Sequence, residues 1–387
     1  MIKQKMLYQK YANEIWNEFL EKKITEYSFK RNYDYGPQGI SSVSKLSPYI
    51  THRVILEYQL IKDVLDKYKG NSVKKFIEEV YWRIYWKGWL ENKSCVWDNF
   101  ISKKDFEYDE YNYEIALEGK TELPFFNSWI EELKDFNYLH NHTRMWFAST
   151  WIFNLGLPWQ LGARLFFEHL YDGDAASNLL SWRWIAGLHT KGKKYFFSPQ
   201  NLKKFSNNRF DIEKIESKDI NISDDFEMVF SSDIFNCQFM KKSDYLVMFE
   251  NDLNEDTLRS LIIKYKKVFL VLLDQSHRQV KISNSVLAFK KKLTSQFAER
   301  FLNIHEISSL SLPQELRDIK QIDLIYPSVG DNNDFINKFK LKHAKKVNNL
   351  VREEDLYSWK FAKKGFFKFK ENIESINKHL QKPKRLW

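Results

Sequence analysis

The sequence predicts a two-domain protein, in which an all-helical domain is followed by a smaller α/β domain. At 387 residues the chain is long enough to form two separate hydrophobic cores. Residues 1–210 carry apolar residues at helical spacing, whereas residues 243–353 alternate strand-like and helix-like patterns. A polar, charge-rich passage over 211–242 is assigned to a linker. Residues 354–387 are expected to form a final helix and a basic tail.

The helical part begins with an amphipathic helix over 8–24 and a polar loop over 27–44. A cluster of hydroxyls, Ser41 to Ser47, then precedes an apolar helix over 49–65. Such a helix start can bind an anion, because unpaired N–H donors and the positive end of the dipole point at the ligand. The alternative is a plain serine cap.

Residues 74–91 are predicted to form a helix with one face that mixes aromatic and charged residues, namely Glu79, Trp82, Arg83 and Trp86. An acid and an arginine on such a face either pair with each other in the core or face a polar ligand in a cavity. The following segment, 97–123, has the composition of an acidic loop, and Pro124 is expected to open the next helix.

Residues 125–190 are predicted to form closely spaced helices, interrupted at 156–158. Within them Asp174, Asn178 and Trp182 are each four residues apart, so on a helix they line one face. An acid, an amide and an indole in line are typical of a binding surface. The alternative is an aromatic core helix with Asp172 as its N-cap.

The second part is predicted to form a parallel sheet with crossover helices, a small Rossmann-like domain. Strands are expected over 244–250, 267–274 and 322–328, and helices over 256–265, 284–302 and 333–344. No GxGxxG follows the first strand, so dinucleotide binding in this domain is not supported.

Composition narrows the function classes. The formal net charge of +10 favours an anionic partner such as nucleic acid, and the 17 % of aromatic residues suits a large core or a site for stacking and electron transfer. Cys95 and Cys237 have no spacing typical of a disulfide framework or a metal site. Without a signal peptide or a membrane-sized apolar run, we expect a cytoplasmic protein with no metal and no membrane partner.

Together these features resemble the DNA photolyase and cryptochrome family over roughly residues 27–205. In that family an all-helical domain holds FAD and an α/β domain packs beside it. The resemblance therefore implies an all-helical photolyase-type FAD-binding domain followed by a small Rossmann-like α/β domain. The family normally places its α/β domain first, so the order here is that of a circular permutation, which surface termini make physically reasonable.

The resemblance also implies a set of cofactor residues. Those matching the FAD site are Tyr27, Val43, Ser44, Lys45, Leu46, Ser47, Arg83, Arg144, Asp172, Asp174 and Asn178. Lys45 replaces the usual arginine, which keeps the charge but loses the bidentate fork. Asn178 matches the residue that faces flavin N5, and asparagine there is the photolyase-like choice. An antenna chromophore is not identified.

Five further residues match the pocket that holds a flipped-out pyrimidine dimer in photolyases, namely Glu79, Trp82, Asn141, Met145 and Trp184. The resemblance also implies a catalytic set of Trp182, Trp159 and Asn178. Trp182 would lie nearest the flavin, and Trp159 would come next in the electron-transfer chain. The distal position of that chain falls on Ala116. Either the chain is cut there, or Tyr113, Trp151 or another aromatic residue replaces the exit.

The function implied is FAD-dependent, blue-light-driven repair of cyclobutane pyrimidine dimers by electron transfer from excited FADH⁻, in a protein expected to be a monomer with damaged DNA as its partner. The alternative is a cryptochrome-like photoreceptor or redox-sensing flavoprotein without repair activity. A non-photochemical DNA-binding flavoprotein is a third hypothesis, which the basic charge alone permits.

Overall fold

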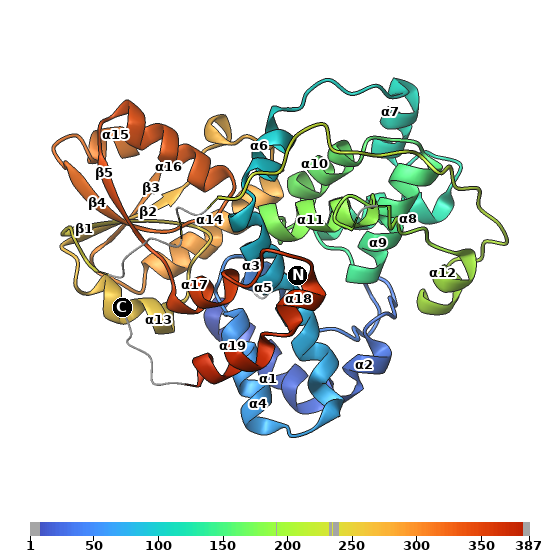
Figure 1. Cartoon of the computed structure of the whole chain (residues 1–387), viewed down its shortest axis with the longest axis horizontal. Helices are drawn as coiled ribbons and strands as arrows, with labels where there is room; N and C mark the ends of the chain where they lie inside the picture. Colours follow the sequence, from blue (N-terminus) through green and yellow to red (C-terminus); the bar gives the residue numbers. More distant parts are fainter. Residues whose placement is uncertain (1–7, 191, 232–233, 235–239, 382–387) are drawn as a thin grey trace.

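The computed structural model describes residues 8–190, 192–231, 234 and 240–381 (Figure 1). The helices of its first part are α1 (Tyr8–Lys22), α2 (Tyr27–Lys30), α3 (Ser47–Thr51), α4 (Glu57–Lys67), α5 (Lys74–Asn92), α6 (Cys95–Ser102), α7 (Glu110–Glu118), α8 (Pro124–Phe136), α9 (Asn141–Ser149), α10 (Trp159–His169), α11 (Ala175–Ile185) and α12 (Pro199–Phe205). A π-helical turn, Thr150–Asn154, follows α9 directly. The first helix and α5 lie where the sequence predicts them, and Pro124 opens α8 as expected.

The predicted helix over 49–65 is instead two helices, α3 and α4. The chain turns between them at Arg53, whose φ of 49° lies in the left-handed region. Its guanidinium is 2.7 Å from Asp355 and 3.5 Å from Asp252, both in the second half of the chain. These buried ion pairs hold Arg53 in a conformation that a continuous helix would not allow.

The expectation of a loop over 97–123 is wrong, because α7 and most of α6 lie within it. The acidic residues that indicated a loop include the cap of a helix. Asp109 accepts a hydrogen bond from the Asn112 amide at the start of α7, and Gly119, with φ of 68°, ends that helix. Trp97 and Phe100 bury one face of α6.

The second part forms a parallel sheet with strand order β3-β2-β1-β4-β5. Its elements are β1 (Tyr245–Phe249), α13 (Glu255–Ile262), β2 (Lys267–Leu272), α14 (Asn284–Ala298), β3 (Ile304–Ser308), α15 (Leu312–Glu315), β4 (Gln321–Ile325), α16 (Asp331–Lys342) and β5 (Lys346–Leu350). Strands β2 and β3 are added on one side of β1, and β4 and β5 on the other side. The boundary between β1 and β4 is therefore the topological switch point, where ligands bind in open α/β sheets.

Two strands, β3 and β5, are absent from the sequence prediction. Both lie at the edges of the sheet and are only partly buried, so neither carries the continuous apolar run of β1 or β2. The apolar runs mark the central strands, and the edge strands have no comparable signal.

The core of the sheet is continuous with the N-terminal helix. Leu246 and Met248 of β1 share a buried cluster with Trp16 and Phe19 of α1, whereas Val247 and Phe249 face the opposite side, toward α15 and α16. Helix α1 reaches the sheet part through α14, where the Tyr8 ring lies 5.9 Å from that of Phe289 and the Tyr8 amide donates to Gln296 Oε1 at 2.9 Å.

The segment that joins the two parts runs back across the helices (Figure 1). Ile212, Ile222 and Phe226 pack on the helical core, and Asp224 accepts two hydrogen bonds of 2.6 Å from buried Arg183. The Lys218 amide donates to the Phe153 carbonyl oxygen at 2.7 Å. The described part of this segment is therefore packed against the helical part.

The C-terminal helix predicted after residue 354 is three short helices, α17 (Glu353–Trp359), α18 (Phe366–Lys370) and α19 (Ile373–Leu380). They pack on α5, where the Tyr81 hydroxyl donates to Asn377 Oδ1 at 2.5 Å. The basic tail from 382 and Cys237 lie outside the described residues. None of the described helices combines the length and the apolarity needed to span a bilayer.

Candidate functional site

Helix α5 positions the centre of the site. Arg83 donates to Glu57 Oε1 at 3.0 Å, to Thr51 Oγ1 at 2.9 Å and to Ser177 Oγ at 3.0 Å. The same guanidinium lies 2.8 Å from Asp174. The predicted Arg83 and Asp174 are thus brought together, from α5 and the start of α11.

The acids around Arg83 are held in the charged form. Burial opposes ionisation of Glu57, but the cations Lys87, Arg83 and Arg53 outweigh it and lower its pKa to about 2. Burial also opposes ionisation of Asp174, yet Arg83 and Lys87 bring its pKa below the usual value. The network is therefore a fixed arrangement of charges at neutral pH.

A second predicted pair, Arg144 and Asp172, adjoins the first. Arg144 Nη2 donates to both carboxylate oxygens of Asp172, at 3.0 and 2.9 Å. The Thr51 hydroxyl donates to the Asp172 carbonyl oxygen at 3.3 Å, which links this pair to Arg83. The Tyr138 ring contacts two cations, with its centroid 5.4 Å from the Arg144 guanidinium and 5.6 Å from Lys45 Nζ.

The hydroxyl-rich loop before α3 supplies the cationic end of the site. Lys45 has a φ of 55°, a left-handed conformation that is uncommon for a residue with a side chain. Val43, Ser44 and Ser47 stay partly exposed beside it, and Leu46 is buried. A hollow of about 10 Å³ is lined by Ser41, Ser42, Lys45, Tyr138 and His140, among others. A bound cofactor therefore requires these side chains to move apart.

Tyr27 lies next to the helix that carries Glu79. Its ring makes an edge contact with Phe76 at 5.2 Å, and burial, with the charge of Glu79, raises the pKa of its hydroxyl. A neutral phenol at this position can donate a hydrogen bond to a ligand at any physiological pH.

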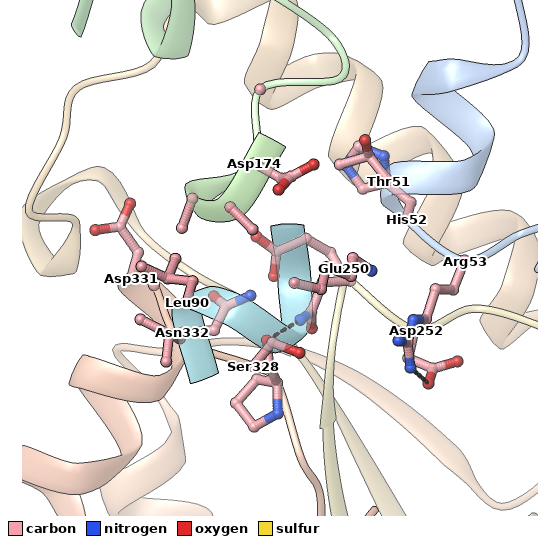
Figure 2. A pocket seen from close by; sticks show the side chains of 18 of the residues that line it. Thr51, His52, Arg53, Leu90, Asp174, Glu250, Asp252, Ser328, Asp331 and Asn332 are labelled. Carbon is pink, nitrogen blue, oxygen red and sulfur yellow. Dashed lines mark hydrogen bonds and ion pairs between the residues drawn. The ribbon is translucent and has the colours of Figure 1, made fainter. Parts of the chain in front are cut away.

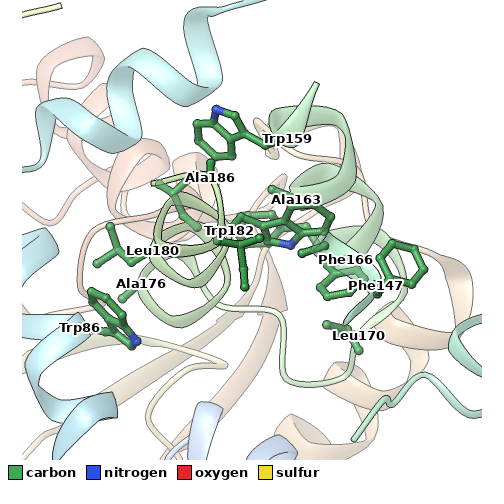
Figure 3. Close-up of a cluster of buried hydrophobic side chains, with 14 of the residues drawn as sticks. Trp86, Phe147, Trp159, Ala163, Phe166, Leu170, Ala176, Leu180, Trp182 and Ala186 are labelled. Carbon is green, nitrogen blue, oxygen red and sulfur yellow. The ribbon is translucent and has the colours of Figure 1, made fainter. Parts of the chain in front are cut away.

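Helix α11 carries the predicted acid, amide and indole, but its N-cap is Asp174 and not Asp172. Asp174 accepts a hydrogen bond from the Ser177 amide at 2.8 Å. Asn178 Nδ2 donates to the Ala163 carbonyl oxygen at 2.9 Å. Trp182 packs edge-on against Phe166 and fits against Gly162, where a Cβ would come within 2.2 Å of the indole (Figure 3).

The positions assigned to the electron-transfer chain are all buried. Trp182 and Trp159 are 2 and 6 % exposed, and Ala116 is completely buried in α7. The position assigned to the distal end is therefore not an exit to solvent, and a tryptophan at residue 116 would have to displace the core.

The five residues predicted to face a lesion have separate partners. Glu79 is 2.8 Å from Lys75 Nζ and 3.6 Å from Arg31 Nε, Trp82 stacks on Phe366 at 3.7 Å, and Trp184 lies 5.6 Å from Tyr195. Asn141 is exposed and Met145 is partly buried. Phe366 is the unexpected member, because it comes from the C-terminal segment.

Several buried polar atoms at the site have no hydrogen-bond partner within the described part of the chain, namely Trp182 Nε1, His140 Nε2 and Glu57 Oε2. Unpaired buried donors and acceptors are costly, so they indicate a polar ligand or water. The residues present fit FAD chemically, since the lysine and hydroxyls can hold a diphosphate and the arginine–carboxylate pairs can hold the polar edge of a flavin.

Sequence reasoning missed Thr51, Glu57 and Ser177, which join the predicted residues into one network. Ser177 has a local signal, as it is the third residue after a capping aspartate. Thr51 and Glu57 have none, because their roles depend on the chain turning at Arg53.

A cavity of about 110 Å³ was also not predicted. It lies beyond the carboxyl ends of β1 and β4, where Asp174 and Thr51 of the helical part face Glu250 and Asp331 of the sheet part (Figure 2). Burial raises the pKa of Asp331 to about 6, whereas Lys290 and Arg278 overcome the burial of Glu250 and lower its pKa.

A family model described as the FAD binding domain of DNA photolyase matches residues 76–214. Deoxyribodipyrimidine photo-lyases from Buchnera aphidicola and Thermus thermophilus are 30 % identical over 214 residues and 31 % identical over 189 residues. These matches cover 51 and 47 % of this chain, and 44 and 43 % of the relatives. The chain thus spans less than half the length of either relative.

Solved structures with partial similarity include a class III photolyase from Agrobacterium tumefaciens and a cryptochrome from Synechocystis. Their TM-scores are 0.42 and 0.45, at 23 and 22 % identity. Each comparison covers 51 % of this chain, and 42 and 43 % of the two structures. Residues 76–214 are thus similar to the FAD binding domain of DNA photolyase, and the similarity to deoxyribodipyrimidine photo-lyases extends over about half of this chain.

Proposed function

We propose that this protein repairs cyclobutane pyrimidine dimers in DNA by blue-light-driven electron transfer from bound FAD. The observation that supports this most is the joined network of Arg83, Asp174, Arg144 and Asp172. Two arginine–carboxylate pairs from separate helices converge within the segment that the family model matches. Such fixed charges can orient a flavin without reorganising during the reaction.

Bound reduced FAD would supply the light-driven electron that splits the dimer. The chain contributes binding, orientation and exclusion of water. Asn178 uses its amide nitrogen on Ala163, so its carbonyl oxygen is the group available to accept a hydrogen bond from the cofactor. Buried Trp182 and Phe166 close the adjacent side to water.

On the lesion side, Glu79 and Asn141 would bond base edges while Trp82 and Trp184 stack on the bases and Met145 fills space. In the present arrangement the ring of Trp82 is covered by Phe366, parallel within 11°. A base can stack on this face of Trp82 only after Phe366 moves. The proposed repair reaction therefore includes displacement of α18.

The same contact favours one alternative, a photoreceptor in which light changes the position of the C-terminal helices. The C-terminal segment also holds α5 through Lys370, which is 2.7 Å from Glu78. A protein of this kind would bind FAD and respond to light without repairing DNA.

DNA as the partner is supported by the net charge of +10. The lysines at 193–204 contribute less than their number indicates, because Lys194 is 2.6 Å from Asp219 and Lys203 is 2.8 Å from Asp211. We expect phosphate contacts here mainly from Lys193 and Lys204.

The test uses the full chain loaded with FAD and reduced chemically, a thymine-dimer oligonucleotide, and blue light against a dark control. Repair is measured by chromatography of the products. We expect a Glu79→Gln variant to lose about 10-fold in repair, as for a lost hydrogen bond to a charged group. A Glu131→Gln variant, altered at an exposed acid of α8, is the control.

No repair by protein that demonstrably holds reduced FAD would contradict the proposal. In that case, a light-dependent change in protease cleavage within 355–381 would support the photoreceptor. Equal repair by the two glutamine variants would remove Glu79 from the lesion site.

A further inference from the structure

An aromatic path leads from Trp182 toward the surface without passing through Trp159. The Trp182 ring contacts the ring of Trp151 at 6.5 Å, nearly perpendicular to it. Trp182 lies among Phe147, Phe166 and Ala163, and Trp159 lies apart from this group (Figure 3). Trp151 is completely buried, so it lies inside the helical core.

The path continues through two tyrosines. The Trp151 ring is 5.9 Å from that of Tyr113 on α7, and Tyr113 is 5.2 Å from Tyr108. Both tyrosines are partly exposed. Ring contacts thus connect Trp182 with the partly exposed Tyr108 in three steps.

Local structure holds Trp151 in this place. It belongs to the π-helical turn Thr150–Asn154, and wide turns of this kind occur frequently at functional sites. Its Nε1 donates to the Pro158 carbonyl oxygen at 2.9 Å, which fixes the orientation of the indole. The path is therefore rigid at its central residue.

The surroundings of Trp159 are less suited to electron transfer. Its neighbour is Phe100, at 6.0 Å, and a phenyl ring is much harder to oxidise than an indole or a phenol. The Arg183 guanidinium lies 5.8 Å from the Trp159 ring, although Asp224 pairs with it. A cation beside the ring disfavours a second positive charge on it.

We propose that Trp182, Trp151, Tyr113 and Tyr108 form the route by which electrons from an external thiol reach the flavin site. This rests on the proposed function, since it requires a light-excited electron acceptor next to Trp182. Trp182 gives one electron to that acceptor and regains one from Trp151. Trp151 in turn takes one from Tyr113.

Oxidised Tyr113 releases its phenolic proton to water and becomes a neutral phenoxyl radical. It takes one electron from Tyr108, whose phenol releases its own proton to water, while Tyr113 regains a proton. A thiol then gives a hydrogen atom to the Tyr108 radical, and two thiyl radicals formed in successive turnovers combine to a disulfide. Burial raises the pKa of the Tyr113 hydroxyl, so the residue begins each cycle as the neutral phenol.

The test is photoreduction of the oxidised, FAD-loaded full chain under blue light with dithiothreitol, followed by flavin absorbance. We expect Trp151→Phe to slow photoreduction at least tenfold. Trp129→Phe is the matched control, because Trp129 is equally buried and its Nε1 has no hydrogen-bond partner among the described residues. It should stay within twofold of wild type.

A second readout locates the radical directly. With a nitroso spin trap present, illumination should leave adducts at Tyr113 or Tyr108, identified by peptide mass spectrometry. Trp151→Phe should abolish these adducts while circular dichroism stays unchanged. Tyr113→Phe should abolish the adduct at Tyr108 as well.

Photoreduction of Trp151→Phe at the wild-type rate would overturn the route, as would a wild type that holds FAD and is not photoreduced. A large loss in Trp159→Phe with none in Trp151→Phe would assign electron entry to Trp159. Dimer repair is measured on chemically reduced protein, which bypasses the route. Failure of repair and failure of the route are therefore separate results.

Discussion

Helix α5 has two faces with different chemistry, and the contrast between them explains much of the molecule. Arg83, Lys87 and Glu91 follow one another at four-residue intervals and meet polar groups of α4, α11 and the sheet part. Trp82 and Gly88 instead meet the C-terminal helices. The charged face holds the proposed cofactor network, and the aromatic face controls access to the proposed lesion site.

The strongest test of the charged face is Arg83→Ala, which removes the guanidinium that is hydrogen-bonded to buried Glu57 and paired with buried Asp174. We expect a loss of about 3–5 kcal/mol in the free energy of unfolding, measured in urea, together with loss of bound FAD. Arg83→Lys keeps the charge and should lose less. An alanine variant as stable as wild type would mean that these charges are effectively solvated.

Glu91 should make the stability of the charged face depend on pH. Burial raises its pKa from 4.5 to about 7, despite hydrogen bonds from the Tyr326 hydroxyl and the Val329 amide. Between these values the folded protein binds more protons than the unfolded chain, so stability falls as pH rises through this window.

Glu91→Gln stays neutral and should escape this loss. Its stability relative to wild type should rise by about 3 kcal/mol from the acid end of the window to the neutral end, in urea titrations at several pH values. A difference that does not vary with pH would show that Glu91 ionises freely.

Gly88→Ala tests how closely the aromatic face is packed. An added Cβ would lie 2.7 Å from the Trp359 ring and 2.9 Å from Ala362. We expect a loss of about 1–3 kcal/mol from overpacking, despite the better helix propensity of alanine. Gly365→Ala, where nothing lies within 4 Å, is the control for thermal unfolding. Equal melting temperatures for both variants would contradict close packing.

Phe366→Leu should have the smallest effect on stability, about 1 kcal/mol, because it removes the ring stacked on Trp82 but keeps an apolar side chain. We also expect this variant to bind a pyrimidine dimer more tightly, because the ring that competes with the base for Trp82 is absent. Phe367→Leu, altered at an 80 % exposed neighbour, is the control. Weaker dimer binding in Phe366→Leu would indicate that Phe366 supports the lesion site.

The sequence predicts α5 and α8 well, because their signals are local: apolar spacing in both and Pro124 at the start of α8. The turn at Arg53 has no such signal, since the acids that hold it come from residues 252 and 355. The edge strands also escape detection, because edge strands lack long apolar runs.

The residues of the candidate site likewise include some that the sequence indicates and some that it does not. The pairs Arg83 with Asp174 and Arg144 with Asp172 join residues that the family resemblance singles out, and the structure brings each pair together. Thr51, Glu57 and Phe366 depend on long-range packing and are not in that set. The assigned roles of the cofactor and lesion residues remain proposals that the variants above can test.

The late completion of the buried cluster that contains α1 has a consequence for synthesis on the ribosome. Trp16 and Phe19 are made early, but their cluster is completed by Leu246 and Met248. At a translation rate of about 5–20 residues per second, that delay is on the order of tens of seconds. Trp16 and Phe19 can already pack on Phe76 during this time. Tyr8, however, lacks its partners Phe289 and Gln296 until α14 is made, so the first turn of the nascent helix is a natural binding site for chaperones.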